Sequence, residues 1–442
     1  MSDADKPALK PANDNPWYCL ATMHGEQAAE FDEELASKNR LAWNRWISTD
    51  LSDEERASLV KNGFPEPQLA PMSAEEKSAF CRAFADRIGR ETDSPPEPTE
   101  KCDFTFTHFD RWVSFDGFLF RKHTDFGSAT FSHIAELSAT FCGRASFYSV
   151  TFSDAYFGSA TFSDSINFNS ATFTRDADFT SATFSGDAFF SSAKFSGEGD
   201  FSSAKFFGDA VFQWAEFGGF ATFSSAMFLS FLTFLNARFK TITAFDNADF
   251  RTNVPDFRGA TMHEGTEWHG AIWPTPPPDS ESAQNQVYAY ERLKQEMERL
   301  KKHEDEQLFF RKELRARRGT ESLLSAARLL NFLYWVLSDY GQSIGRPLIW
   351  LFGLFTIGGA VFYAMNPNMP SAALRLEAVP HAAALSFGYI FPFIPITHEI
   401  ISAIPVAGLS WAEKIVGVAQ SVLGTPLLFL LGLALRNRFR MR

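Results

Sequence analysis

The sequence predicts a mainly β protein whose centre is a right-handed, four-sided β-helix. A helical module is expected before this centre and a membrane-inserted helical hairpin after it. Three observations support this prediction: a regular phenylalanine repeat in the middle, helix-capping patterns near the start, and two long apolar stretches near the end. The 442 residues are enough for about two or three domains.

The strongest pattern is a ladder of seventeen phenylalanines whose spacings alternate between six and five residues. In an α-helix, a step of five or six residues would place successive rings on roughly opposite sides. In a flat strand, the steps of five would place the rings on both faces of the sheet. A chain that turns a corner every five or six residues would instead send each ring inward, onto the coil below. The predicted core ladder is Phe162, Phe168, Phe173, Phe179, Phe184, Phe190, Phe195, Phe201, Phe206, Phe212, Phe217, Phe223, Phe228, Phe234, Phe239, Phe245 and Phe250.

Alanine lies two positions before most ladder phenylalanines, and the exceptions are Ile166, Gly199, Leu232 and Thr243. The alternating extra residue predicts a one-residue bulge at every second corner and about 22 residues per coil. A weaker start of the ladder, from Phe104 to Leu137, places the solenoid at residues 103–270. At the usual spacing between strands this is a rod about 35 Å long.

The repeated unit, as in Ser181-Ala182-Thr183-Phe184, resembles the pentapeptide-repeat family. The resemblance implies a β-helix in which the small and the bulky residue of each unit point inward. The solenoid together with charged helices, the segment SDYGQS at residues 338–343 and the terminal RNRFRMR resembles bacterial membrane proteins of this family. That resemblance implies an architecture but no reaction.

The start of the chain is expected to be disordered over residues 1–14 and to form a helical module over residues 15–92, which would cap the first coil. Ser52 with Glu55, and Ser73 with Glu76, predict two helix starts by the capping-box pattern. A preceding amphipathic helix is expected to share one apolar face among Phe31, Leu35, Leu41, Trp43 and Trp46.

After the solenoid we expect a proline-rich linker over residues 271–283 and a charged helical stalk over residues 284–346. A short apolar seam in this stalk has two interpretations. The helix either packs back on its own chain or pairs with a second subunit. The seam consists of Tyr290, Leu293, Met297 and Leu300.

Residues 347–442 are predicted to form a membrane domain in contact with the lipid bilayer. Leu348–Tyr363 and Ile415–Leu435 are the predicted spans. By the positive-inside rule both termini and the solenoid are cytoplasmic, at a bacterial inner membrane. The flanking cations are Arg311, Lys312, Arg315, Arg317, Arg318, Arg328 and Arg346 before the first span, and Arg436, Arg438, Arg440 and Arg442 after the second, whereas the connecting loop carries Arg375 and Lys414.

Between the predicted spans, residues 382–396 are apolar but too short to cross a bilayer, so we expect a re-entrant segment. The order of elements resembles the two-helix pore module of potassium-channel-like proteins, which line a filter with backbone carbonyls. Here no second glycine follows Gly388-Tyr389. A pore would also require several copies of the chain. The resemblance implies a pore-like segment of Ser386, Phe387, Gly388 and Tyr389.

No catalytic pattern stands out, so we expect a protein that is not an enzyme and holds no cofactor or metal. The chain has no nucleophile-elbow motif and no phosphate-binding loop. The cluster of His263, Glu264, Glu267 and His269 lacks the spacing of helical zinc sites and is expected to form a turn.

The chain is acidic, with a formal net charge of −12, which argues against nucleic-acid binding. Residues 102–270 contain 19 Asp and Glu against 11 Lys and Arg, a difference of −8. A mimic of duplex DNA would need about one charge per 1.7 Å of axis, more than twice this density. We therefore expect a scaffold whose outward solenoid residues dock a protein partner. The alternatives are a channel-like oligomer gated by the solenoid and a DNA-mimic inhibitor of a DNA-binding enzyme.

Overall fold

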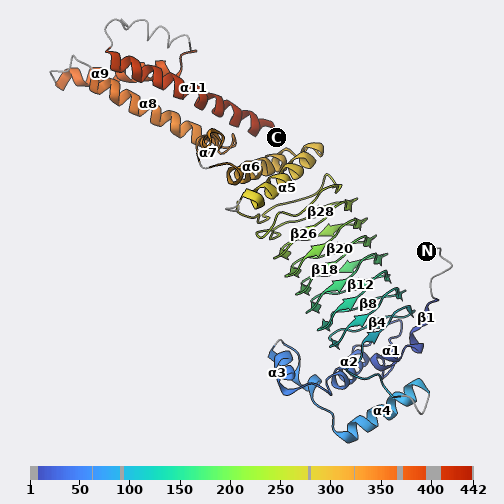
Figure 1. Cartoon of the computed structure of the whole chain (residues 1–442). Coiled ribbons are helices and arrows are strands. Elements are labelled where there is room, and N and C mark those ends of the chain that lie inside the picture. The colour runs from blue at the N-terminus through green and yellow to red at the C-terminus, as the bar shows by residue number, and fades with distance from the viewer. Residues whose placement is uncertain are drawn as a thin grey trace. The chain divides into compact units, whose positions relative to one another are not determined.

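The computed structural model divides into two compact units, which we describe separately (Figure 1). The first unit contains residues 1–275 and 288–302, and the second contains residues 276–287 and 303–442. The structure describes residues 8–61, 63–89, 94–276, 280–322, 324–365, 372–394 and 410–440.

The centre of the first unit is a four-sided parallel β-helix made of very short strands (Figure 1). Each side of the coil contributes its strands to one parallel sheet. Sheet A contains β1 (Lys10–Pro11), β3 (Thr107–Phe109), β7 (Thr130–Phe131), β11 (Thr151–Phe152), β15 (Thr172–Phe173), β19 (Lys194–Phe195), β23 (Glu216–Phe217) and β27 (Arg238–Phe239). Sheet B contains β2 (Cys102–Asp103), β6 (Thr124–Asp125), β10 (Ala145–Ser146), β14 (Ile166–Asn167), β18 (Ala188–Phe189), β22 (Ala210–Val211) and β26 (Leu232–Thr233).

The other two sheets complete the coil. Sheet C contains β4 (Val113–Ser114), β8 (Ala135–Glu136), β12 (Ala155–Tyr156), β16 (Ala177–Asp178), β20 (Gly199–Asp200), β24 (Ala221–Thr222) and β28 (Thr243–Ala244). Sheet D contains β5 (Leu119–Phe120), β9 (Thr140–Phe141), β13 (Thr161–Phe162), β17 (Thr183–Phe184), β21 (Lys205–Phe206) and β25 (Met227–Phe228). The prediction of a four-sided β-helix is confirmed.

The predicted phenylalanine ladder forms the core of the solenoid. Every one of the seventeen rings is at most 4% exposed. Phe206 pairs in register with Phe184 and Phe228, and its ring centroid lies 4.5 Å and 4.9 Å from theirs. The register step of 22 residues in this region agrees with the predicted coil length.

The gap in the sequence ladder between Leu137 and Phe162 is also filled by buried phenylalanines. They are Phe141, Phe147, Phe152 and Phe157. Here the coils are one residue shorter, since Phe152 pairs with Phe131 and Phe162 pairs with Phe141, 21 residues earlier. The ladder is therefore continuous, and only its spacing changes.

The corners alternate between two types, as the spacing of six and five predicts. At a five-residue corner the Ala171 amide donates to the Phe168 carbonyl at 3.0 Å, and Ser170 has a left-handed φ of 60°. The six-residue corners are open bends, where an aspartate of one coil accepts a hydrogen bond from the next coil. The Asp176 carboxylate, for example, accepts from the Glu198 amide at 2.9 Å.

The helices at the start of the chain cap the first coil, as predicted. They are α1 (Pro16–Ala21), α2 (Glu33–Ile47), α3 (Asp53–Lys61) and α4 (Ala74–Ile88), with 3₁₀ turns η2 (Ala12–Asp14) and η3 (Glu66–Leu69). Trp43 is fully buried, donates from Nε1 to the Leu119 carbonyl at 3.0 Å, and stacks on Phe118. Both predicted capping boxes are present, at Ser52 with Glu55 and at Ser73 with Glu76.

Two predictions for this module were wrong in detail. Residues 10–14 are ordered, because β1 extends sheet A by pairing with β3, with the Lys10 amide donating to the Phe106 carbonyl at 2.8 Å. Phe31 precedes α2, and it and Leu41 are exposed. Leu41 is about 200° around the helix from Trp43, so the two side chains point in opposite directions.

The far end of the solenoid is covered by the second half of α5 (Ser280–Arg299). Tyr290, Leu293 and Met297 of the predicted seam are buried there, and the Tyr290 ring lies 6.0 Å from Trp273. The seam therefore packs on its own chain. Trp273 belongs to the solenoid end, because Ile272 still bridges to Asp249, so the predicted linker 271–283 is shorter than expected.

The second unit is helical and consists of α6 (His303–Thr320), α7 (Ala326–Ser338), α8 (Gly345–Met365), α9 (Ala372–Ile390) and α11 (Trp411–Arg440). The predicted charged helical stalk 284–346 consists of several helices, and Lys301 adopts a left-handed φ of 59° between α5 and α6. Two segments, Gly345–Met365 and Trp411–Phe439, are long and apolar enough to cross a membrane. Only 17% and 22% of their apolar windows are buried, unlike the core helix of a soluble protein.

The segment between these two helices differs from the prediction. Instead of a short apolar segment over 382–396, α9 begins at Ala372, passes through Pro380 and ends at Ile390, while residues 395–396 lie outside the described residues. The sequence at the start of α9 contains Arg375 and Glu377, so this helix is not recognisable as a continuous apolar stretch. α9 contacts both α8 and α11, so the three helices form one bundle.

Candidate functional site

The predicted pore-like segment, Ser386 to Tyr389, lies in the last turns of α9 and has helical backbone. A helix uses its carbonyls in its own hydrogen bonds, so this segment does not present the extended carbonyl row of a potassium filter. Ser386 is fully buried, donates to the Phe355 carbonyl at 2.9 Å and accepts from Gln420 Nε2 at 2.7 Å. These bonds join α9 to both α8 and α11.

Tyr389 has the same role one turn further along. Its ring stacks on Phe362 at 5.8 Å and faces Gly417, where an added Cβ would overlap the ring. Its carbonyl accepts a hydrogen bond from Ser421 Oγ at 2.7 Å. Within one copy of the chain, the segment therefore mediates helix packing.

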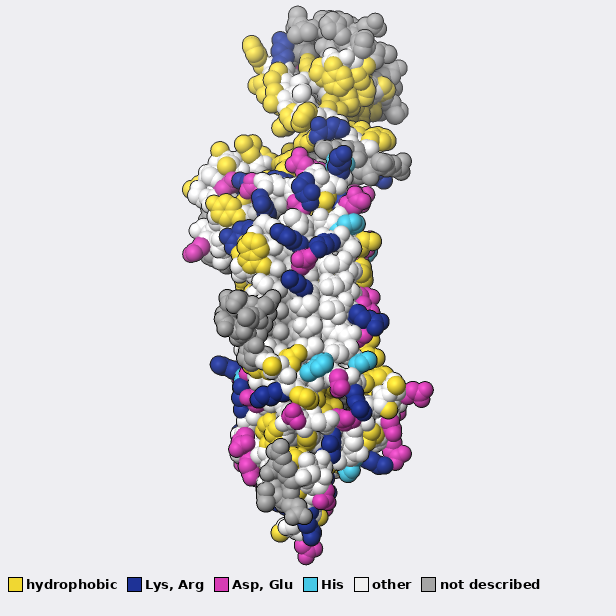
Figure 2. Space-filling view, turned by 90° about the vertical axis from the view of Figure 1, so that its right-hand side faces the viewer, with side chains coloured by type: hydrophobic (Ala, Val, Ile, Leu, Met, Phe, Trp, Pro, Cys, Tyr) yellow, Lys and Arg dark blue, Asp and Glu magenta, His cyan; other side chains and the backbone are white. Residues whose placement is uncertain are grey.

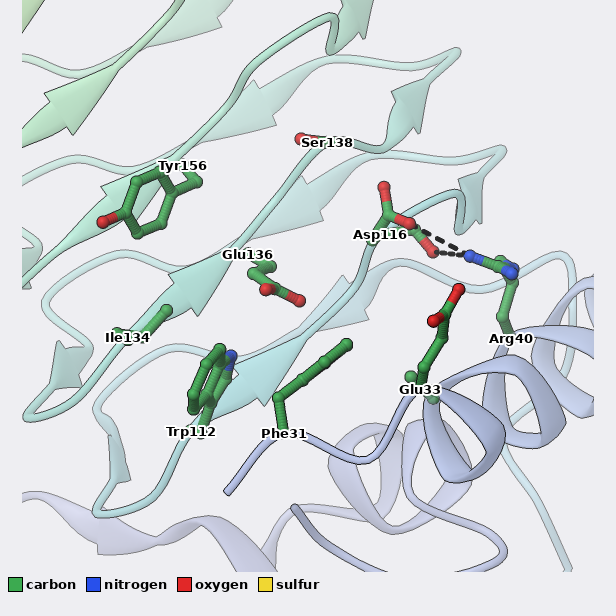
Figure 3. A pocket seen from close by; sticks show the side chains of 10 residues that line it. Phe31, Glu33, Arg40, Trp112, Asp116, Ile134, Glu136, Ser138 and Tyr156 are labelled. Atoms are coloured by element: carbon green, nitrogen blue, oxygen red, sulfur yellow. Dashed lines mark hydrogen bonds and ion pairs between the residues drawn. The ribbon is translucent and has the colours of Figure 1, made fainter. Parts of the chain in front are cut away.

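A groove of about 460 Å³ lies between the N-terminal module and sheet C (Figure 3). Phe31 stacks on Trp112 with ring centroids 5.2 Å apart, and Arg40 pairs with Asp116 at 3.0 Å. Across the groove lie Glu136 and Tyr156 (Figure 3). No sequence pattern marks this groove, because its residues come from segments far apart in the chain, such as those of Phe31, Trp112 and Tyr156.

The side chains that line this groove include no pair of a nucleophile and a histidine or lysine base. Its lining residues include no histidine, cysteine or lysine. Burial raises the pKa of the Glu136 carboxyl and the Asp116 charge raises it further, whereas the neighbouring polar side chains of Ser114 and Trp112 lower it. The groove thus contains aromatic side chains and carboxylates, with its one guanidinium engaged by Asp116.

The acidic residues of the solenoid have a structural use. Asp178, Asp187 and Asp200 each accept a hydrogen bond from a backbone amide, at 2.7 to 3.0 Å. These carboxylates stabilise the backbone of the solenoid, so their presence is explained without the DNA-mimic interpretation. Figure 2 shows a broad area in the middle of the rod with few charged or hydrophobic side chains.

The clearest surface feature of the solenoid is an apolar patch on sheet B, which we call the Val211 patch. Phe189 and Val211 lie in register on adjacent coils with their side chains half-buried. The corners bordering these strands carry Phe207, Trp214 and Phe231, which are 49%, 54% and 45% exposed. A sequence signal existed, since these positions are occupied by polar residues in the preceding coils, such as Ser185, Ser192 and Asp209.

Trp214 is the most unusual member of the patch. Its φ is 59°, a left-handed conformation that costs a bulky side chain energy. The same corner carries Ser192 one coil earlier and Asn236 one coil later, both left-handed. Serine and asparagine are well suited to such a corner, so the turn does not require a tryptophan at this position.

The predicted turn at the solenoid exit is present. His263 Nδ1 accepts from the Gly265 amide at 3.0 Å, and its carbonyl accepts from Thr266 Oγ1 at 2.8 Å. Among the described residues, no group of three or more His, Cys, Asp or Glu side chains is arranged to hold a metal ion.

Comparison with known proteins bears on the solenoid. Residues 147–194 match the family model described as pentapeptide repeats (9 copies). No curated protein and no solved structure matched the chain. The matched residues lie within the continuous phenylalanine ladder, and strands of the same four sheets continue on both sides of them. The solenoid at the centre of this chain is therefore a pentapeptide-repeat β-helix.

Proposed function

We propose that this protein is a non-enzymatic scaffold anchored in a bacterial inner membrane, with both termini and the solenoid in the cytoplasm. Its Val211 patch docks a protein partner. The two candidate spans and the cations at their outer ends, Arg346 and Arg436 among them, support the anchoring and the orientation. The single observation that carries the docking is the exposed, left-handed Trp214.

At this corner, folding requires only a residue that tolerates a left-handed backbone. A serine would satisfy the left-handed backbone, as Ser192 does one coil earlier. The tryptophan instead adds strain and leaves more than half of its surface in water. Exposed aromatic residues that gather on one face are typical of binding surfaces, where tryptophan is frequent among the residues that contribute most to affinity.

The partner is a protein because of the chemistry of the patch. Its centre is aromatic and aliphatic, and its borders carry neutral polar residues such as Ser191 and Gln213. An apolar centre with a polar rim is the composition of protein–protein interfaces. A nucleic acid would need a surface rich in lysine and arginine, which the acidic solenoid does not offer.

The test is quantitative crosslinking of the full-length protein in its native membranes. Trp214→Ser is expected to reduce the yield of the crosslinked partner at least about tenfold, as for an interface hot spot. The same variant should unfold at an equal or higher temperature, because it relieves strain. Phe220→Ser is the matched control, since Phe220 is 39% exposed on the corner between sheets A and C. Equal partner yield from Trp214→Ser and the wild type would rule out docking on this patch.

The channel-like alternative has one supporting observation, the buried polar pair of Ser386 and Gln420 between three apolar helices. A water path would have to be enclosed by several copies, because one bundle of three packed helices leaves no lumen. Mass measurement of the detergent-solubilised protein distinguishes the two functions. A strict monomer excludes the channel and leaves the scaffold intact.

A further inference from the structure

The turn that joins α7 to α8 is held by hydrogen bonds to α7 and α11. Asp339, Tyr340 and Gly341 have left-handed φ values of 49°, 59° and 77° in succession. Tyr340 is fully buried, and its hydroxyl donates to Asn331 Oδ1 of α7 at 2.9 Å. Asn437 of α11 donates from Nδ2 to the Gly341 carbonyl at 3.0 Å. Such a strained turn persists only where its surroundings fix it, which places Asp339 firmly.

Three arginines converge on Asp339. Arg315 lies 3.3 Å from its carboxylate, Arg311 lies 3.7 Å away, and Arg346 of α8 lies 3.8 Å away. One carboxylate cannot neutralise three guanidinium groups, and these distances are longer than those of good charge-assisted hydrogen bonds. We call Asp339 with Arg311, Arg315 and Arg346 the Asp339 cluster.

One further observation indicates that Arg315 lacks an acceptor. Arg315 Nε is buried and has no hydrogen-bond acceptor within the part of the chain that the structure describes. An added anion would provide that acceptor.

The adjoining helix α7 has an apolar face that stays exposed among the residues the structure describes. Leu329, Phe332 and Leu333, spaced as i, i+3 and i+4 on one face, are 58%, 45% and 39% exposed. The other face packs on α6, where Asn331 Nδ2 donates to the Leu314 carbonyl at 2.9 Å. Arg318 lies over the ring of Trp335 at 5.0 Å, an arrangement of cation and aromatic ring that suits a membrane–water interface.

We propose that the Asp339 cluster binds the phosphate of an anionic phospholipid headgroup, while the apolar face of α7 lies in the interfacial layer of the same leaflet. This inference rests on the membrane anchoring proposed above. The cluster sits where α6, α7, α8 and α11 meet, at the beginning of one candidate span and the end of the other (Figure 1). A lipid satisfies both features at once, because its phosphate meets the arginines and its acyl chains meet the leucines.

The test uses the purified full-length protein in a neutral detergent and follows its thermal unfolding. Three additives are titrated separately: short-chain phosphatidylglycerol, short-chain phosphatidylcholine, and inorganic phosphate. Phosphatidylglycerol is expected to raise the unfolding temperature in a saturable manner, because it binds the folded state. Phosphatidylcholine and inorganic phosphate should have little effect at the same concentration. Equal shifts with phosphatidylcholine, or an equal shift with phosphate alone, would overturn the assignment to an anionic lipid.

Variants of two neighbouring arginines locate the effect. Arg315→Ala should raise the phosphatidylglycerol concentration at half-shift by about tenfold, as expected for one charge-assisted contact. Arg317→Ala is the matched control, because Arg317 pairs with Glu313 at 2.8 Å on the same helix, and its half-shift concentration should stay within about twofold. If Arg315→Ala does not fold, Arg311→Gln takes its place. A half-shift concentration that these variants leave unchanged would refute the site.

Failure of the lipid site can be distinguished from failure of either part of the proposed function. Retention of the protein in membranes after carbonate washing tests the anchoring, and crosslinking through Trp214 tests the docking. A protein that stays in the membrane but shows no preference for phosphatidylglycerol refutes the lipid site alone. A protein that carbonate releases refutes the anchoring on which the lipid site rests.

Discussion

At the scale of single residues, each ladder phenylalanine is held by the rings directly above and below it. Phe206 is 1% exposed and stacks on Phe184 and Phe228, whereas its neighbour Lys205 points outward and is exposed. In this two-residue strand, one residue therefore points into the core and the other points to the surface.

We expect Phe206→Ala to cost about 3–5 kcal/mol, because it leaves a cavity in a close-packed stack, and Lys205→Ala to cost less than about 1 kcal/mol. Chemical unfolding followed by circular dichroism would compare the two variants. Similar losses of stability in both variants would contradict the inward orientation of the ladder.

Glu136 gives a prediction about pH. Burial first, and the Asp116 charge in addition, raise its pKa, so its protonated form is favoured in the folded state. The contribution of Glu136 to the free energy of unfolding is therefore largest below the ordinary pKa of glutamate. This contribution is lost as the pH rises through the raised pKa of the folded state. Glu136→Gln should raise the unfolding temperature at pH 7, and this gain should disappear near about pH 4. A gain of the same size at both values would show that ionisation of Glu136 is not the cause.

At the scale of elements, the two ends of the solenoid are covered by helices of the same chain. α2 covers the first coil through Trp43, and the second half of α5 covers the last coils through Tyr290 and Met297. In the second unit, α9 packs on α8 and α11 through Ser386 and Tyr389. Coverage of open ends is what a repeat protein needs, because its terminal coils otherwise expose unpaired backbone and core.

Trp43→Ala is expected to destabilise the protein by about 3–5 kcal/mol, because it removes a fully buried ring that contacts Phe118 and Phe120. Leu41→Ala on the same helix should cost under about 1 kcal/mol, since Leu41 is 43% exposed. Hydrogen exchange would show whether the loss begins at the first coil. Unchanged protection of residues 102–120 in Trp43→Ala would argue against a capping role for α2.

At the scale of the whole molecule, the chain combines a repeat solenoid with a helical unit that contains two candidate spans. We expect the full-length protein to stay in the membrane fraction after carbonate washing, and a chain truncated before Gly345 to be released. The reason is that each of the two apolar helices is about as long as the hydrocarbon core of a bilayer is thick, so each can cross it and bury its apolar side chains there. Release of the full-length protein by carbonate would mean that α8 and α11 pack against protein rather than lipid.

The sequence by itself determined the β-helix, because burying one ring per side imposes a repeat that no helix or flat strand reproduces. It also determined the capping boxes, which depend on residues three positions apart. Only the tertiary structure decided that the α5 seam packs on its own solenoid, that residues 382–390 continue an earlier helix, and that three arginines meet at Asp339. These features depend on contacts between residues far apart in the chain or on the placement of one helix against another, and no local period records such contacts.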